Sequence, residues 1–198
     1  MIIGLQREDI IKRFKNRPDD QIFIFDNMLS DEHCDFLRNF IDAHAVKDEK
    51  TVIHNTNVKA YVFDLSTSTN CSLFNNILSP VINKVIRLLN ARYFINVSYN
   101  FYIKILLRKI YGDTQLHIDG PKSDVRIKEH KVLRELAFIL CLNDDYEGGE
   151  IIFPSQNREI KLKKGQLLLF PPYWTHPHYT NAPKNDTFRY TVTTWLCE

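Results

Sequence analysis

Residues Phe188–Trp195, with the sequence FRYTVTTW, form the stretch that decides the fold of this chain. β-Branched and aromatic side chains dominate it, as is typical of a β-strand. Successive side chains of a strand point to opposite faces. One face is therefore predicted to carry Arg189, Thr191, Thr193 and Trp195, and the other to carry mainly aromatic and aliphatic side chains.

Five further β-rich runs precede this strand. They are Tyr93–Ile110, Val132–Leu142, Glu150–Phe153, Arg158–Leu162 and Gln166–Phe170, and turn residues separate them. Five of the six glycines in the chain fall at these joints: Gly112, Gly120, Gly148, Gly149 and Gly165. Many short strands joined by turns indicate a β-sandwich or a jelly roll.

The first half of the chain supplies helices and two early strands. Asp31–Ala45 has apolar residues at helical spacing, and Ser30 before it is a good N-cap. A second amphipathic helix is predicted to start at Ser79-Pro80, because proline is tolerated in the first turn. Strands are expected at Gln21–Phe25 and Val58–Leu65. The predicted fold is mainly β with flanking α-helices, in which the N-terminal helices pack on one sheet.

Length and composition limit the organisation and the classes of partner. The 198 residues suit one domain, with supporting elements over about 1–95 and the β core over about 96–198. Lysine and arginine total 26 against 24 aspartate and glutamate, so nucleic-acid binding is not indicated. The four scattered cysteines favour reduced thiols and a cytoplasmic setting. No apolar run is long enough for a membrane span, and no signal peptide is expected.

A metal site is indicated by His117-Ile118-Asp119, because residues i and i+2 of a strand point to the same side. A second source of histidine, Trp174–His178, follows after several predicted strands. Two imidazoles and one carboxylate form the facial triad that leaves open positions on Fe(II) for a cosubstrate and dioxygen. Zinc accepts the same ligands, so the triad alone leaves the metal and the reaction open.

The inward-facing arginine of Phe188–Trp195 separates these alternatives. A buried guanidinium needs an anion, because an unpaired buried charge is costly. The distal carboxylate of 2-oxoglutarate is such an anion: Arg189 would bind it bidentately and Thr191 would add a hydrogen bond. The competing interpretation is that Arg189 faces solvent or pairs with an internal acid such as Asp186.

Several motifs together resemble a known family, the 2-oxoglutarate/Fe(II) oxygenases of the prolyl 4-hydroxylase type. The motifs are His117-x-Asp119, Asn143–Glu150 with Phe153-Pro154, Lys164–Pro171, a distal histidine, Pro183 and Arg189-Tyr190. The similarity runs from about Phe101 to Trp195, and Phe23–Leu37 resembles the strand and helix that precede the core. The resemblance implies a double-stranded β-helix of the cupin-like kind, with Fe(II), 2-oxoglutarate and dioxygen as reactants and ascorbate as a candidate reductant. Arginine at 189 departs from the lysine of the collagen-type branch and agrees with the oxygen-sensing branch and bacterial relatives.

The resemblance also bears on individual site residues. Pro183 and Arg189 stand five and eleven residues after His178, closer to the family spacing than their positions relative to His176. We therefore expect His178 to be the distal ligand, with His176 as the alternative ligand, a residue that contacts the ligands, or part of the pocket wall. Tyr102 is a further candidate for contact with 2-oxoglutarate.

The expected reaction is hydroxylation of a C–H bond, with a peptidyl proline as the preferred substrate and with release of succinate and carbon dioxide. Pro121–His130, a mildly basic polar loop directly after His117 and Asp119, is predicted to fold over an extended peptide. An ordinary solvated connection is the alternative for this loop. Alternative functions are the same chemistry on a free amino acid, nucleobase or other small molecule, a zinc enzyme, and a non-catalytic jelly-roll module. The sequence gives no oligomeric state.

Overall fold

The computed structural model describes residues 8, 11–12, 17–47, 59–65, 71–100, 103–120, 122–127 and 130–197. Within these residues the largest element is an antiparallel sheet of eight strands. Its order is β1 (Phe23–Phe25), β11 (Leu167–Phe170), β7 (His130–Cys141), β14 (Arg189–Cys197), β4 (Leu106–Ile110), β3 (Ala60–Asp64) and β2 (Val46–Lys47), and β6 (Lys122–Ile127) pairs with β7. The strand predicted from FRYTVTTW is β14, which lies inside this sheet and is buried along its whole length.

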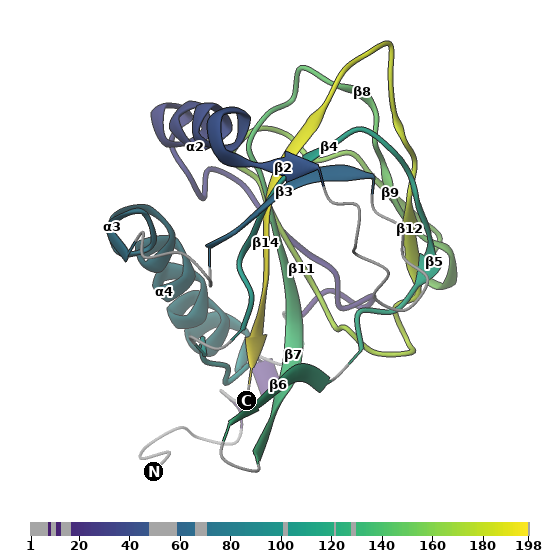
Figure 1. Ribbon diagram of the computed structural model, residues 1–198. Coiled ribbons are helices and arrows are strands. Elements are labelled where there is room, and N and C mark those ends of the chain that lie inside the picture. Colours follow the sequence, from purple (N-terminus) through teal and green to yellow (C-terminus); the bar gives the residue numbers. More distant parts are fainter. Residues whose placement is uncertain are drawn as a thin grey trace.

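A second, smaller sheet faces the first (Figure 1). Its order among the described strands is β10 (Arg158–Ile160), β9 (Ile151–Phe153), β12 (His178–Thr180) and β5 (Thr114–His117), and β8 (Glu147–Gly148) pairs separately with β13 (Pro183–Lys184). A 3-10 turn, η4 (Pro154–Gln156), joins β9 to β10. Buried side chains from both sheets form one core, which includes Ala137, Ile151, Phe153, Phe170 and Trp195. The predicted jelly roll is therefore confirmed.

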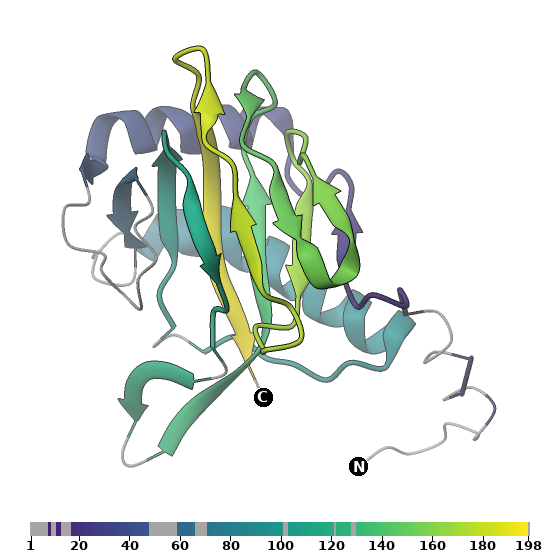
Figure 2. The ribbon, with the colours of Figure 1, turned by 90° about the vertical axis from the view of Figure 1, so that its right-hand side faces the viewer.

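Helices cover the outer face of the large sheet, so that the molecule has three layers (Figures 1 and 2). α2 (Asp31–His44) begins after Ser30, whose hydroxyl accepts a hydrogen bond from the backbone of His33 at 3.3 Å. α4 (Ser79–Leu88) is preceded by α3 (Cys71–Leu73) and the π-helical turn η2 (Phe74–Leu78), and is followed by η3 (Leu89–Tyr93). The helical region thus starts earlier than Ser79-Pro80 predicts, because three buried residues extend its apolar face: Leu73, Ile77 and Leu78. No helix among the described residues is long and apolar enough to cross a membrane.

The segment predicted as the loop Pro121–His130 is largely a β-hairpin. β6 spans Lys122–Ile127 and pairs with the first residues of β7, and the hairpin extends beyond the two sheets in Figure 2. Polarity alone suggested a loop, yet charged residues alternate with Val125 and Ile127 in the sequence. Such a period of two suits a β-ribbon, so the prediction of a loop was wrong for Lys122–Ile127.

Candidate metal centre

Two neighbouring strands of the small sheet bring His117 and His178 together. His117 ends β5 and His178 begins β12, and the two residues are directly paired across the strands. Asp119 follows β5, and its Oδ1 atom lies 3.7 Å from His117 Nε2 and 4.0 Å from His178 Nε2. The candidate ligand atoms of these three residues all lie within 4.8 Å of one another. This spacing allows one metal ion to contact all three, and we call the set the triad.

Backbone hydrogen bonds orient both imidazoles of the triad. His117 Nδ1 lies 2.8 Å from the carbonyl oxygen of Gln115, and His178 Nδ1 lies 3.2 Å from that of His176. A carbonyl can only accept, so each Nδ1 carries the proton and donates it. The lone pair of each histidine is thereby left on Nε2, which faces Asp119. Outer hydrogen bonds of this kind are what fix the tautomer of a metal-binding histidine.

The interior of the jelly roll holds His178 in its neutral form. Its residue is 4% exposed, and its ring lies 5.4 Å from that of Phe153 and 4.8 Å from that of Phe170. Burial lowers the pKa of His178, although the neighbouring charge of Asp119 opposes this shift. A neutral imidazole is the form that can bind a cation.

Asp119 is held by two residues whose role was not foreseen from the sequence. Trp195 Nε1 donates to Asp119 Oδ2 at 3.0 Å, and Arg134 Nη1 donates to the Asp119 carbonyl oxygen at 2.9 Å. The guanidinium of Arg134 also lies over the Trp195 ring, 3.9 Å from its centre. Trp195 could have been found, because it shares a face of β14 with Arg189. No alternation in the sequence points to Arg134.

Arg189 faces the interior, as the alternation of Phe188–Trp195 predicted. It is 4% exposed, and Nη1 donates to the carbonyl oxygen of Gly149 at 2.6 Å. Arg189 Nε and the hydroxyl of Thr191, which is 1% exposed, have no hydrogen-bond partner among the described residues. Within the same residues no carboxylate, Asp186 included, forms an ion pair with Arg189. Burial lowers the pKa of Arg189, and two unsatisfied donors on one face of β14 match the needs of a carboxylate ligand.

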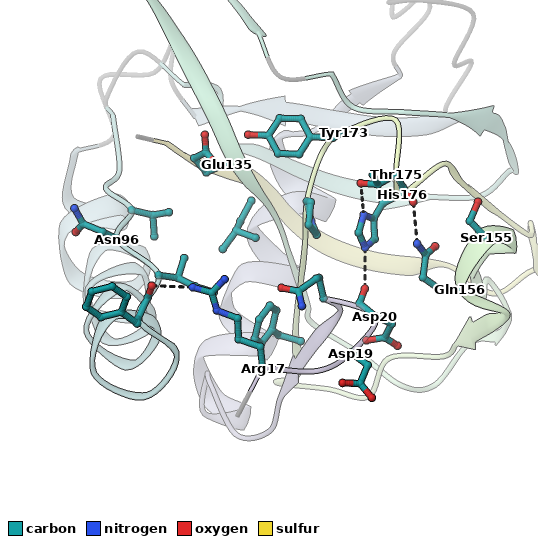
Figure 3. A pocket seen from close by; sticks show the side chains of 17 residues that line it. Arg17, Asp19, Asp20, Asn96, Glu135, Ser155, Gln156, Tyr173, Thr175 and His176 are labelled. Carbon is teal, nitrogen blue, oxygen red and sulfur yellow. Dashed lines mark hydrogen bonds between the residues drawn. The ribbon is translucent and has the colours of Figure 1, made fainter. Parts of the chain in front are cut away.

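His176 lies away from the triad and lines a separate cavity of about 860 Å³ (Figure 3). Its Nε2 donates to the carbonyl oxygen of Asp20 at 2.8 Å, and its Nδ1 lies 2.9 Å from the Thr175 hydroxyl. The two histidines do not share a strand, because β12 begins only at His178 and His176 belongs to the preceding turn. Tyr102, the remaining candidate, lies outside the described residues.

The cavity adjoins the triad through this turn but does not contain it. Its lining includes Arg17, Glu135, Gln156 and Tyr173 besides His176. Arg17 donates from Nε and Nη2 to the carbonyl oxygens of Tyr93 and Phe94, at 2.9 Å and 2.8 Å. The metal chemistry that the sequence predicts therefore concerns the triad and not this cavity.

Comparison with known proteins agrees with this geometry. Residues 107–197, which include the triad and Arg189, match the model of the 2OG-Fe(II) oxygenase superfamily. The segment carries the 2OG-Fe(II) oxygenase pattern. In the oxygenase segment the predicted resemblance is thus confirmed, and the segment contains β5, β7, β12 and β14 and all of β4 except Leu106. A comparison with curated protein sequences gave no significant match.

Solved structures extend the likeness of fold beyond the oxygenase segment. A viral collagen prolyl hydroxylase from Paramecium bursaria Chlorella virus-1, in complex with 2OG, is 19% identical with a TM-score of 0.62, over 89% of this chain and 95% of that one. A Trichoplax adhaerens prolyl hydroxylase, in complex with a hypoxia inducible factor peptide fragment, is 17% identical with a TM-score of 0.69, over 95% and 88%. A Pseudomonas putida prolyl-4-hydroxylase is 13% identical with a TM-score of 0.61, over 96% and 98%. At these identities the likeness concerns the fold.

Proposed function

We propose that this protein is an Fe(II)- and 2-oxoglutarate-dependent dioxygenase that hydroxylates a C–H bond of a peptidyl proline. The observation that carries the proposal is the unsatisfied Arg189 Nε and Thr191 hydroxyl, buried on the same face of β14 as the tryptophan that holds Asp119. A triad alone suits several metals, whereas a triad with a buried anion site suits a metal whose cosubstrate is a dicarboxylate.

Each residue of the site has a separate task in this function. His117, Asp119 and His178 would hold Fe(II), which together with 2-oxoglutarate supplies the activation of dioxygen. Arg189 would bind the far carboxylate of 2-oxoglutarate through its planar fork, and Thr191 would donate a hydrogen bond to the same group. Phe153 and Phe170 lie against the ring of His178 and would keep water from that side of the site.

The substrate class rests on weaker support than the reaction class. Similar folds are named as prolyl hydroxylases, and one of those structures contains a peptide. The β6–β7 hairpin follows His117 and Asp119 in the chain and carries more basic than acidic residues in its sequence. Such a hairpin suits an acidic peptide. A peptide or protein substrate is accordingly favoured over a free amino acid or nucleobase, and ascorbate is proposed as the reductant.

The test measures succinate and the modified substrate in one reaction. Metal-free protein is supplied with Fe(II), 2-oxoglutarate, ascorbate and dioxygen, and is offered panels of proline peptides, free amino acids and nucleosides. We expect succinate to form with a proline peptide, whose mass increases by one oxygen atom. Asp119→Ala and His117→Ala should retain the fold by circular dichroism and form no succinate.

Two outcomes would reject parts of the proposal separately. Turnover of amino acids or nucleosides, with every proline peptide unmodified, would reject the prolyl substrate and keep the reaction class. Absence of 2-oxoglutarate-dependent succinate formation with every panel, together with zinc-dependent hydrolysis, would reject the oxygenase itself.

A further inference from the structure

Asp119 has its two carboxylate oxygens in different surroundings. Oδ1 faces the Nε2 atoms of both histidines, whereas Oδ2 accepts the hydrogen bond from Trp195 Nε1. On the basis of the proposed function, we propose that Trp195 and Arg134 are positioning residues that keep Asp119 a ligand through Oδ1 alone. We call Asp119, Trp195 and Arg134 the clasp.

Arg134 makes the clasp a closed arrangement and not a single hydrogen bond. Its guanidinium lies 3.9 Å from the centre of the Trp195 ring and donates to the backbone of Asp119 at 2.9 Å. The cation therefore restrains the indole from one face and fixes the backbone that carries the carboxylate. A cation over the ring also draws electron density from it, so the indole N–H becomes a better donor to Oδ2. Trp195 is 7% exposed, which keeps water from competing for this bond.

A β-bulge is what places Arg134 in the clasp. Along β7 and β14, Trp195 pairs with Ala137 and Leu196 pairs with Leu136, but Cys197 pairs with Arg134. Glu135 is thus the extra residue on β7. A bulge of one residue reverses the alternation beyond it, and regular alternation would have turned Arg134 to the helical side. The bulge thus turns Arg134 to the side of the sheet on which Asp119 and Trp195 lie.

The clasp has a consequence for the coordination of the metal. A carboxylate that binds through both oxygens occupies two positions, and one that binds through a single oxygen occupies one. With Oδ2 held by Trp195, Asp119 would offer one oxygen to a bound metal, and the three triad residues would leave positions for a chelating cosubstrate and dioxygen. Without the clasp, Asp119 is free to rotate and to take up a further position.

The test compares clasp variants with matched controls. Trp195→Phe removes the N–H donor and keeps an aromatic ring under Arg134, and Arg134→Met keeps the length and removes the charge. Trp174→Phe is the control for the first, because Trp174 is 81% exposed. Arg17→Met is the control for the second, because Arg17 also donates to backbone carbonyl oxygens but lies outside the triad.

Mn²⁺ affinity of the metal-free proteins is measured by electron paramagnetic resonance, and coordination by the absorption spectrum of the Co²⁺-loaded proteins. We expect Trp195→Phe to lower Mn²⁺ affinity about 10–100-fold, the usual effect of losing an outer partner of a metal ligand. Arg134→Met should show a smaller loss, and both should change the Co²⁺ spectrum, while the controls behave as the wild type. If Trp195→Phe does not fold, Arg134→Met carries the same comparison.

The outcomes separate the clasp from the function on which it rests. Wild-type protein that binds neither Mn²⁺ nor Co²⁺ would overturn the metal centre and with it the proposed function. The wild type binding both metals, with both clasp variants matching it in Mn²⁺ affinity and in Co²⁺ spectrum, is the second outcome. It would overturn the clasp and leave the proposed oxygenase in place.

Discussion

Arg189 is the residue whose environment most needs a ligand. It is a buried cation whose Nη1 donates to the Gly149 carbonyl oxygen, and its Nε has no hydrogen-bond partner among the described residues. A carboxylate that binds there would gain charge-assisted hydrogen bonds in a site closed to water. The loss of such a pair commonly costs about 2–5 kcal/mol.

We therefore expect Arg189→Ala to raise the 2-oxoglutarate concentration for half-maximal succinate formation by at least about tenfold. The half-maximal concentration for Arg189→Lys should lie between those of the wild type and Arg189→Ala, because lysine keeps the charge and loses the planar fork. Binding of 2-oxoglutarate to the Mn²⁺-loaded protein, measured by calorimetry, checks the same loss without turnover. Arg87→Ala, on the exposed side of α4, is the control. Equal 2-oxoglutarate affinity in Arg189→Ala would place the anion elsewhere.

At the scale of elements, the ribbon of β8 and β13 depends on Gly148. Its φ is +65°, and a Cβ at this position would lie 2.6 Å from the carbonyl oxygen of Ala182. Gly120 has a similar backbone, with a φ of +81°, but a Cβ there would meet no atom within 4 Å. The two positions separate backbone strain from steric overlap.

Gly120→Ala should lower the free energy of unfolding by about 1–2 kcal/mol, the cost of a left-handed residue with a side chain. Gly148→Ala should lower it by about a further 1–3 kcal/mol, because the backbone carbonyl must also move. Urea unfolding followed by circular dichroism gives both values. Equal losses of unfolding free energy in the two variants would mean that the ribbon moves at Gly148 without a further energetic cost.

The elements also show what the sequence could predict and what it could not. The strands and the inward side of Arg189 and Thr191 followed from a period of two, and His117 and Asp119 converge as residues i and i+2 should. The β6–β7 hairpin was missed because polarity was weighed above alternation. The role of Arg134 could not be predicted, since a bulge cannot be recognised in the pattern of a single sequence. The hydrogen bond from Arg189 to the Gly149 carbonyl oxygen could not be predicted either, because every residue carries a backbone carbonyl.

At the scale of the whole molecule, buried thiols predict how stability depends on pH. Cys34, in α2, and Cys197, at the end of β14, are both fully buried, and burial raises the pKa of each thiol to about 11. In the unfolded chain the same thiols have their ordinary pKa near 9. Between these values the unfolded state gives up its protons first, so stability is retained below about pH 8.5 and falls as pH rises towards 11.

We expect unfolding free energies to fall from pH 8.5 to 10.5 by an amount of order 1–2 kcal/mol per thiol. The double variant Cys34→Ala and Cys197→Ala should be less stable at neutral pH, since it loses packing, but should lose less on going to high pH. Urea unfolding at a series of pH values measures the slope. Tyr99 and Tyr146, whose pKa values burial also raises, should leave a remaining slope in the double variant. Parallel slopes in the two proteins would show that the thiols do not contribute.

The bulge at Glu135 sets how many residues separate Arg134 from Ala137 on the same face of β7. Replacing Glu135 leaves the residue count between Arg134 and Ala137 unchanged, so the guanidinium still faces Asp119. Deleting Glu135 would remove the bulge and leave Arg134 opposite Cys197 in a regular register, so the guanidinium would stay on the side of Asp119. In a strand without the bulge, the residue on this face stands two positions before the counterpart of Ala137 and not three. An alignment without a gap at Glu135 therefore pairs Arg134 with a residue of the opposite face.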